Sequence, residues 1–368
     1  MPSDLDRWLD ELTARGGSDL HLATGNHPII RLHGRLEALD QQNAPLSAEA
    51  ITAAIARVVG EDALDSLRHT GELDAAFERK DGTRLRINAY RQQGDFAAAI
   101  RLLPNRFFEL DELGLDVNLL RRICAMQSGL ILVTGATSSG KSTTIASLVN
   151  EINKTQALHI HTIEDPIEYR HVSQRSFVTQ REVGRDTASF AEALRRSMRQ
   201  DPDVVVVGEM RDLETMTAAL TLAETGHLTF ATLHTSDAVQ SVSRIISSYP
   251  AVHQAQVRVQ LASTLQVVMS QKLVPWADGK GRSLAAEILV ATPNVRAMIR
   301  EEKTHQMRTA MQTGGEYGMQ TLNQSLLSLL NRRVIDRATA LEYSEDKAHL
   351  LEELDLQTSQ KTKRKSVR

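Results

Sequence analysis

The chain has 368 residues, of which 41% are hydrophobic and 24% charged, values typical of a folded protein with two or three domains. Its net charge of −3 argues against a protein that coats nucleic acid, although it allows a local basic patch. The single cysteine, Cys124, excludes an intrachain disulfide and a cysteine-rich zinc site. An acidic N-terminal segment and the lack of about 18 consecutive apolar residues predict a cytoplasmic protein without a signal peptide or membrane span.

The first hundred residues contain short hydrophobic patterns typical of helices and of strands, which together predict a small α+β domain. Leu5, Trp8, Leu9 and Leu12 have the spacing of one helix face. Four later segments alternate or run apolar like half-buried strands: Leu20–Leu22, Ile29–His33, Leu85–Tyr90 and Phe96–Leu103. We therefore expect an N-terminal domain over residues 1–103, followed by a linker over 104–116, where proline, glycine and acidic residues interrupt any period.

From Gly129 onward, apolar strands alternate with helical stretches. Leu130–Val133, Val204–Val207 and Leu228–Leu233 are the clearest strands. Strands separated by helices indicate a mostly parallel sheet covered on both faces. Beyond about Asn294 the pattern is helical. We expect this second domain to span residues 117–355, with a basic, disordered tail over 356–368.

Residues 135–142, GATSSGKS, match the phosphate-binding pattern G-x-x-x-x-G-K-[ST] and lie between a predicted strand and a predicted helix. Glycines allow a tight turn in which several backbone N–H groups point at one phosphate, and the helix N-terminus adds partial positive charge. Lys141 is expected to reach the β- and γ-phosphates and Ser142 to ligate Mg²⁺. The sequence therefore predicts a site for a nucleoside triphosphate and Mg²⁺.

Two acidic sites could serve such a nucleotide. Glu209 follows the apolar strand Val204–Val207, and Glu164 opens the acidic segment Glu164–Glu168. Carboxyl ends of parallel strands meet where ligands bind. One carboxylate would hold the metal and the other activate water, but spacing does not say which does which. A solvated loop acid and a plain turn are the simpler interpretations of the two sites.

Two histidines and two arginines are weaker candidates. His227 and His234 flank the strand Leu228–Leu233, and they fit a structural role, a γ-phosphate sensor or, least well, a metal pair. Arg84 and Arg86 share one face of a predicted strand. They are either surface arginines or arginine fingers for a neighbouring subunit's site, which would require a ring.

Seven ordered motifs resemble those of the retraction ATPases of type IV pili, the PilT family. The resemblance covers about residues 3–355. Its motifs are GGSDLHL (Gly16–Leu22), GATSSGKST (Gly135–Thr143), TIEDPIEY (Thr162–Tyr169), TQREVG (Thr179–Gly184), RQDPDVVVVGEMRDLET (Arg199–Thr215), AETGHLTFATLHT (Ala223–Thr235) and GMQTLNQSL (Gly318–Leu326).

This resemblance implies an α/β chain with an N-terminal PAS-like α+β domain, then a RecA-like P-loop ATPase domain with a helical C-terminal region. It implies a homo-hexamer that hydrolyses ATP to retract pili in twitching motility. Its location would be the cytoplasmic side of the inner membrane at the pilus base, with a membrane platform protein and a paralogous retraction ATPase as partners and no nucleic acid.

The resemblance also assigns roles to individual residues. Glu209 becomes the Mg²⁺-coordinating Walker B residue, Glu164 the general base, and Arg84 and Arg86 arginines that reach nucleotide. The assigned nucleotide-binding residues are Gly135, Ala136, Thr137, Ser138, Ser139, Gly140, Lys141, Ser142, Thr143, His227 and His234. The segment Ala297–Arg300 is similar to a C-terminal motif needed for retraction.

Two departures from the family pattern stand out. Ser138 replaces a common glycine and would be strained if that position requires a positive φ. Gln93 replaces a common arginine, which weakens any role of that position in a neighbouring site.

Four alternatives remain. An accessory PilU-like retraction ATPase carries a different segment at Arg199–Asp203. Pilus-assembly and secretion ATPases often have four cysteines that form a zinc site, and the single cysteine of this chain argues against them. A RecA-like nucleic-acid translocase would need a basic lumen, which the net charge of −3 does little to support. A nucleotide-sensing scaffold would not hydrolyse nucleotide, whereas the complete phosphate loop, Glu164 and Glu209 argue for hydrolysis.

Overall fold

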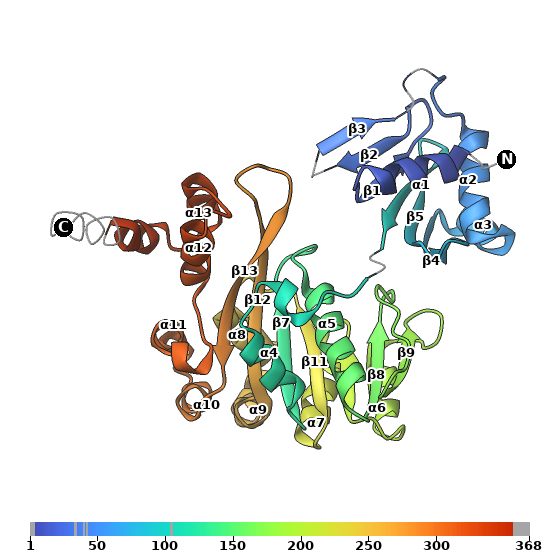
Figure 1. Cartoon of the computed structure of the whole chain (residues 1–368). Helices are drawn as coiled ribbons and strands as arrows, with labels where there is room; N and C mark the ends of the chain where they lie inside the picture. Colours follow the sequence, from blue (N-terminus) through green and yellow to red (C-terminus); the bar gives the residue numbers. More distant parts are fainter. Residues whose placement is uncertain (1–3, 33–34, 40, 42, 104–105, 356–368) are drawn as a thin grey trace. The chain divides into compact units, whose positions relative to one another are not determined.

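The computed structural model describes residues 4–32, 35–39, 41, 43–103 and 106–355 and divides the chain into two compact units, Met1–Arg106 and Phe107–Arg368 (Figure 1). The predicted basic tail lies outside the described residues. Residues 107–116, expected in a linker, belong to the second unit, because Leu110, Leu113 and Leu115 are buried in its core.

The first unit is an antiparallel sheet with helices. Its elements are α1 (Asp4–Ala14), β1 (Asp19–Leu22), β2 (Ile29–Leu32), β3 (Arg35–Ala38), α2 (Ala48–Val59), α3 (Glu61–Thr70), β4 (Glu72–Glu78), β5 (Arg84–Gln92) and β6 (Asp95–Leu102). The strand order is β3-β2-β1-β6-β5-β4, with every pairing antiparallel. The predicted apolar face of α1 is buried in the unit's core.

The second unit is built on a seven-stranded sheet of order β13-β12-β7-β11-β10-β8-β9. Its strands are β7 (Gly129–Thr134), β8 (His159–Glu164), β9 (Phe177–Glu182), β10 (Val204–Val207), β11 (Leu228–Leu233), β12 (Leu265–Pro275) and β13 (Arg282–Val290). Only the β12–β13 pairing is antiparallel. The three predicted strands thus lie side by side at its centre as β7, β11 and β10, which confirms the expected parallel arrangement.

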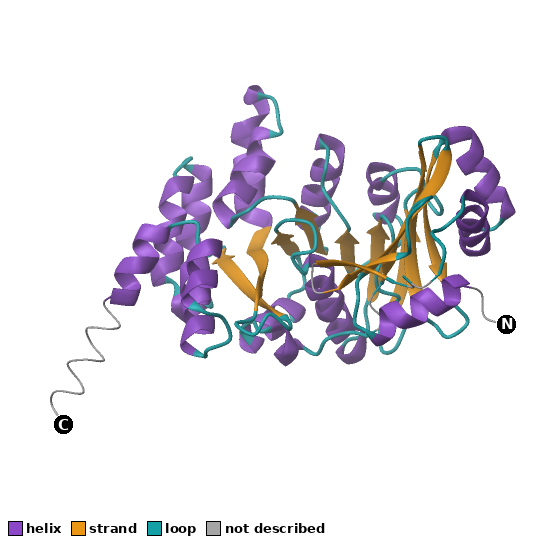
Figure 2. Cartoon of the chain, turned by 90° about the horizontal axis from the view of Figure 1, so that it is seen from above, coloured by secondary structure: helices purple, strands orange, loops and turns teal. Residues whose placement is uncertain are grey.

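Helices cover both faces of this sheet (Figure 2). Its helices are η1 (Leu110–Leu113), α4 (Val117–Cys124), α5 (Lys141–Thr155), α6 (Phe190–Ser197), α7 (Leu213–Glu224), α8 (Ala238–Ser247), α9 (Ala251–Thr264), α10 (Pro293–Arg300), η2 (Thr304–Gln306), α11 (Met307–Thr313), η3 (Gly315–Tyr317), α12 (Leu322–Asn331) and α13 (Arg337–Tyr343). The helical character expected beyond Asn294 is confirmed.

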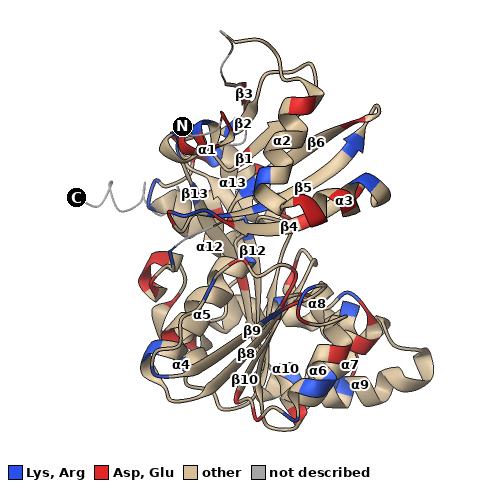
Figure 3. Cartoon of the chain, turned by 90° about the vertical axis from the view of Figure 1, so that its right-hand side faces the viewer, with Lys and Arg blue, Asp and Glu red and all other residues tan. Residues whose placement is uncertain are grey.

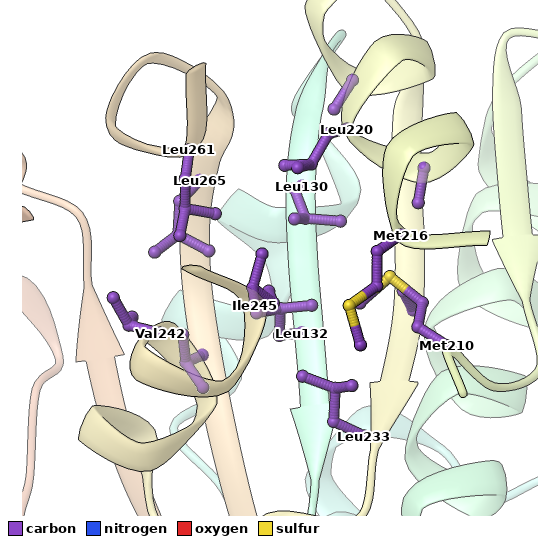
Figure 4. Close-up of a cluster of buried hydrophobic side chains, with 14 of the residues drawn as sticks. Leu130, Leu132, Met210, Met216, Leu220, Leu233, Val242, Ile245, Leu261 and Leu265 are labelled. Carbon is purple, nitrogen blue, oxygen red and sulfur yellow. The ribbon is translucent and has the colours of Figure 1, made fainter. Parts of the chain in front are cut away.

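Strand β7 shows how the two faces are built. Every residue of β7 is buried, and successive side chains point to opposite faces. Leu130 and Leu132 pack with α7, α8 and α9 (Figure 4), whereas Ile131 and Val133 pack with η1, α4 and α5. The chain therefore has an α/β fold with two sheets.

Charge differs between neighbouring helices of the second unit (Figure 3): α6 carries Glu192 in its first turn and Arg195 and Arg196 in its last, whereas the charged residues of α7, Glu214 and Glu224, are both acidic. None of the helices in the described part of the chain is long and apolar enough to cross a bilayer.

Candidate nucleotide site

The phosphate-binding loop connects β7 to α5, as the sequence predicts. Gly135 has φ +139°, and a Cβ there would clash with the Gln271 carbonyl oxygen, so only glycine fits. Gly140 has φ +94° and precedes α5, whose first N–H groups receive no side-chain cap. Uncapped N–H groups at a helix start suit a phosphate. Ala136, Thr137 and Ser138 form the exposed tip of the loop.

The Lys141 side chain hydrogen-bonds to the backbone of the phosphate-binding loop itself. Its Nζ donates hydrogen bonds to the carbonyl oxygens of Gly135 at 2.8 Å and Ala136 at 2.9 Å. Burial lowers the pKa of Lys141, while the charges of Glu209 and Glu168 oppose that shift. An ammonium group has three donors, so one N–H remains for a phosphate oxygen.

The loop also fits a nucleotide by its polar atoms. The Ser139 hydroxyl is buried without a hydrogen-bond partner within the described residues. Buried polar atoms cost free energy unless they are paired. Ser142 is exposed at the start of α5, where its hydroxyl could serve as one ligand of a Mg²⁺ ion. The residues present therefore fit both ATP and Mg²⁺.

Ser138 adopts φ +63°, a left-handed conformation that costs about 1–2 kcal/mol for a residue with a Cβ. The strain expected if this position requires a positive φ is therefore present. Gln93 has φ +53°, a second position where glycine would be favoured.

Glu209 follows β10 and lies at the same sheet edge as the loop. Its carboxylate contacts Arg211 Nη2 at 2.7 Å and His234 Nε2 at 3.2 Å. Burial alone would raise the pKa of Glu209, but the Arg211 hydrogen bond and the His234 and Arg211 charges hold it below its usual range. Glu209 is therefore an ionised carboxylate, the form that binds a cation.

Glu164 ends β8, beside β10 in the sheet. Its Oε1 accepts hydrogen bonds from Thr162 Oγ1 at 2.7 Å and Gln180 Nε2 at 3.1 Å. Burial raises the pKa of Glu164 to about 7, although these hydrogen bonds act in the opposite direction. A carboxylate with a pKa near neutrality is suited to accept a proton, unlike Glu209.

The two candidate histidines lie at opposite ends of β11. His234 follows the strand at the loop edge, because Leu233 pairs with Thr134. His227 precedes the strand, and its Nδ1 lies 3.0 Å from the Leu222 carbonyl oxygen and 3.1 Å from the Thr225 hydroxyl. The two therefore share no metal site, and within this unit His227 is not brought to the loop.

Arg84 and Arg86 lie in the first unit on β5, and both point to the less buried face of that strand, as predicted. Arg86 Nη2 lies 3.5 Å from Asp74 Oδ1 on β4. Both arginines are half-buried on their own unit.

Three residues of the site were not singled out from the sequence as functional. Gln180 contacts Glu164, Tyr169 Oη donates to Thr143 Oγ1 at 2.9 Å, and Gln271 Nε2 donates to Thr144 Oγ1 at 2.8 Å. Gln180 and Tyr169 fall within recognised motifs, so the signal was present. Gln271 carries no local signal, because it reaches the loop only through the pairing of β12 with β7.

The chain matches the type II/IV secretion system protein family over residues 1–280. It is 43% identical to the type IV pilus retraction ATPase PilT of Pseudomonas aeruginosa, over 92% of this chain and 97% of that protein. It is 36% identical to the pilus ATPase PilU of the same organism, over 93% of this chain and 89% of that protein.

Two solved structures of related ATPases superpose closely on this chain. The crystal structure of the pilus retraction motor PilT with bound ADP superposes with a TM-score of 0.86 at 42% identity, covering 95% of this chain and 99% of that one. The Legionella pneumophila ATPase DotB superposes with a TM-score of 0.81 at 28% identity, covering 92% and 95%.

The chain therefore belongs to the type II/IV secretion system protein family and is an ATPase of that family. Within it, the chain is a member of the PilT family.

Proposed function

We propose that this protein hydrolyses ATP to drive retraction of type IV pili. The observation that carries the proposal is the meeting of the Lys141 loop, Glu209 and Glu164 at one edge of a sheet, in a chain 43% identical to a retraction ATPase over almost its whole length. The higher identity to PilT than to PilU, 43% against 36%, favours the principal motor over the accessory one.

In this proposal each residue has a separate task. Backbone N–H groups of residues 135–143 and the Lys141 ammonium bind the phosphates. Ser142 and Glu209 hold Mg²⁺, which neutralises phosphate charge when bound. Glu164 is the general base that takes a proton from the attacking water. His234 holds Glu209 through its contact at 3.2 Å.

The proposal extends to a ring of six subunits. Arg84 and Arg86 would stabilise phosphate charge in nucleotide sites, including a neighbour's, because guanidinium groups bind phosphate oxygens with matched geometry. We interpret the first unit as a PAS-like domain, supported by its antiparallel sheet with flanking helices, and the second as a RecA-like ATPase domain, supported by its parallel sheet with a phosphate loop.

The remaining parts of the proposal rest on the relationship to PilT. The ring would work on the cytoplasmic side of the inner membrane, attached peripherally at the pilus base. There it would contact a membrane platform protein and, in bacteria that have one, a paralogous retraction ATPase. Within its own unit His227 lies away from the phosphate-binding loop. We therefore propose that it reaches nucleotide only when the ring is assembled.

The assignment of the general base is tested by Glu164→Gln. Loss of the proton acceptor should reduce phosphate release by about 100-fold or more, while a fluorescent ADP analogue still binds. Glu192→Gln, which alters a half-buried carboxylate paired with Arg196 on α6, is the matched control and should leave turnover unchanged. Full turnover in Glu164→Gln would remove Glu164 from the mechanism.

A further inference from the structure

The side-chain amide of Gln180 makes three hydrogen bonds beside the candidate base. Its Nε2 donates to Glu164 Oε1 at 3.1 Å and to the Tyr169 carbonyl oxygen at 2.9 Å, and its Oε1 accepts from the backbone N–H of His171 at 2.7 Å. A primary amide has two donor hydrogens and one acceptor oxygen. Both polar atoms of Gln180 are therefore engaged, and its orientation is fixed by three separate partners.

Gln180 restrains the Glu164 side chain from a neighbouring strand of the sheet. Thr162 also donates to Glu164, but it lies two residues earlier on β8 and moves with that strand. Gln180 lies on the neighbouring strand β9, where the register pairs it with Thr162. A charged group also faces Glu164: Glu168, four residues further along the chain, hydrogen-bonds to it through its backbone and repels it through its charge.

The Tyr169 end of this network leads to the phosphate loop. Tyr169 is 5% exposed, and its ring lies 5.6 Å from that of Phe107. Its hydroxyl donates to Thr143 Oγ1 at 2.9 Å, and Thr143 directly follows Ser142 in the first turn of α5. Gln180 thus binds both the carboxylate of Glu164 and the segment that contacts the loop helix.

We propose that Gln180 is a positioning residue, which sets the Glu164 carboxylate relative to the first turn of the phosphate-loop helix through the Tyr169–Thr143 contact. This inference rests on the proposed role of Glu164 as the base. A carboxylate free to rotate would spend less time aligned with the attacking water, and misalignment by about 1 Å can cost 100-fold in rate.

The test replaces Gln180 by methionine, which has a similar length and volume but no amide. Gln180→Met should lower kcat by about 10- to 100-fold, while KM for ATP and binding of a fluorescent ADP analogue stay within twofold. The acidic limb of the kcat–pH profile should move to higher pH by roughly half a unit to one unit, because a hydrogen bond that stabilises the carboxylate is lost. A purely structural role would not move this limb.

Two further variants keep the test decisive. Gln180→Glu preserves the size and adds a like charge, so the acidic limb should lie higher still; it serves if the methionine variant is unstable. Thr179→Val removes the hydrogen bond to His159 Nε2 at 3.0 Å on the opposite face of β9 and should leave both kcat and the acidic limb unchanged.

A double-mutant cycle separates this inference from the role of Glu164. Combined with Glu164→Gln, the Gln180→Met change should have no further effect on kcat. If Glu164→Gln keeps full turnover, the base assignment fails first. If Glu164→Gln abolishes turnover but Gln180→Met retains wild-type kcat and an unmoved acidic limb, the positioning role is wrong. The positioning role is also wrong if Gln180→Met lowers kcat by the same factor in the Glu164→Gln background as in wild type.

Discussion

His234 Nε2 lies 3.2 Å from Glu209 Oε1 and thereby joins the carboxyl ends of the neighbouring strands β11 and β10. The contact orients the carboxylate proposed to hold Mg²⁺, and partners of metal ligands commonly contribute 10- to 100-fold to affinity or activity. His234→Ala should therefore raise the Mg²⁺ concentration needed for half-maximal ATPase rate by about tenfold. The magnesium dependence of phosphate release measures this.

His253→Ala is the control, because His253 is an exposed residue on α9. It should leave the magnesium dependence unchanged. An identical magnesium requirement in His234→Ala would show that the Glu209–His234 contact does not serve the metal.

Lys141→Ala should abolish ATP hydrolysis, with a rate loss of about 100-fold or more, because the loop loses the cation aimed at the β- and γ-phosphates. Lys154→Ala changes a lysine on the same helix whose Nζ pairs with Glu109 at 2.6 Å; a surface pair of this kind contributes about 1 kcal/mol at most. Steady-state turnover should therefore separate the two variants. Equal turnover in both would contradict the nucleotide site.

Stability should depend on the ionisation of Glu164. Burial raises its pKa from 4.5 to about 7, so the folded state binds more protons than the unfolded state between these values. Stability is then lost as pH rises through that window. Glu164→Gln removes the ionisable group. Its free energy of unfolding relative to that of wild type should therefore increase between pH 5 and pH 8, by at most about 3 kcal/mol, and its relative melting temperature should rise in the same interval.

Thermal unfolding of both proteins across that range is the measurement. Asp186→Asn, on an exposed carboxylate, controls for general charge effects. A difference in melting temperature that is flat from pH 5 to pH 8 would show that Glu164 does not titrate there.

The sequence predicted the parts of this site that depend on local order, namely the phosphate loop, the three central strands and the two carboxylates at strand ends. It did not predict β9 or the β12–β13 hairpin, because residues such as Gln180, Arg181 and Gln271 interrupt the apolar pattern of these strands. Their partners are set by strand register, which pairs Thr162 with Gln180 and Ser270 with Thr134.

The histidines illustrate the same limit. Seven positions separate His227 from His234, and only the knowledge that a six-residue strand fills the interval places them at opposite sheet edges. By contrast, the alternation of Arg84 and Arg86 with buried Leu85 and Ile87 was readable directly, because side chains alternate along any strand.

Ser138→Gly should stabilise the protein by up to about 1 kcal/mol, because glycine adopts the observed φ of +63° without the steric cost borne by serine. Thr137→Gly, at another exposed position of the same loop, is the matched comparison. Thr137 is absent from the positive-φ positions, so the change should destabilise by about 0.5–1 kcal/mol through unfolded-state entropy. Chemical denaturation measures both, and greater destabilisation by Ser138→Gly would contradict a strained loop.

Arg84→Ala and Arg86→Ala should each lower ATP hydrolysis at the nucleotide sites of the proposed ring, because an arginine finger contributes about 10³- to 10⁵-fold to rate. In mixtures with wild-type subunits, activity should fall faster than the wild-type fraction. Arg57→Ala, which alters an exposed arginine paired with Asp6 at 2.7 Å in the same unit, should leave the activity of the mixture unchanged at every ratio. Proportional dilution by the Arg84 and Arg86 variants would argue against shared sites.

The most direct test of the whole account is pilus length and retraction, followed by fluorescence microscopy in cells that lack this protein and in the same cells supplied with wild type or Glu164→Gln. If ATP hydrolysis at this site drives retraction, cells with no protein or with Glu164→Gln should carry excess, immobile pili, and wild type should restore retraction. Cells that lose their pili without the protein would identify an extension motor instead, and retraction restored by Glu164→Gln would contradict the proposed chemistry.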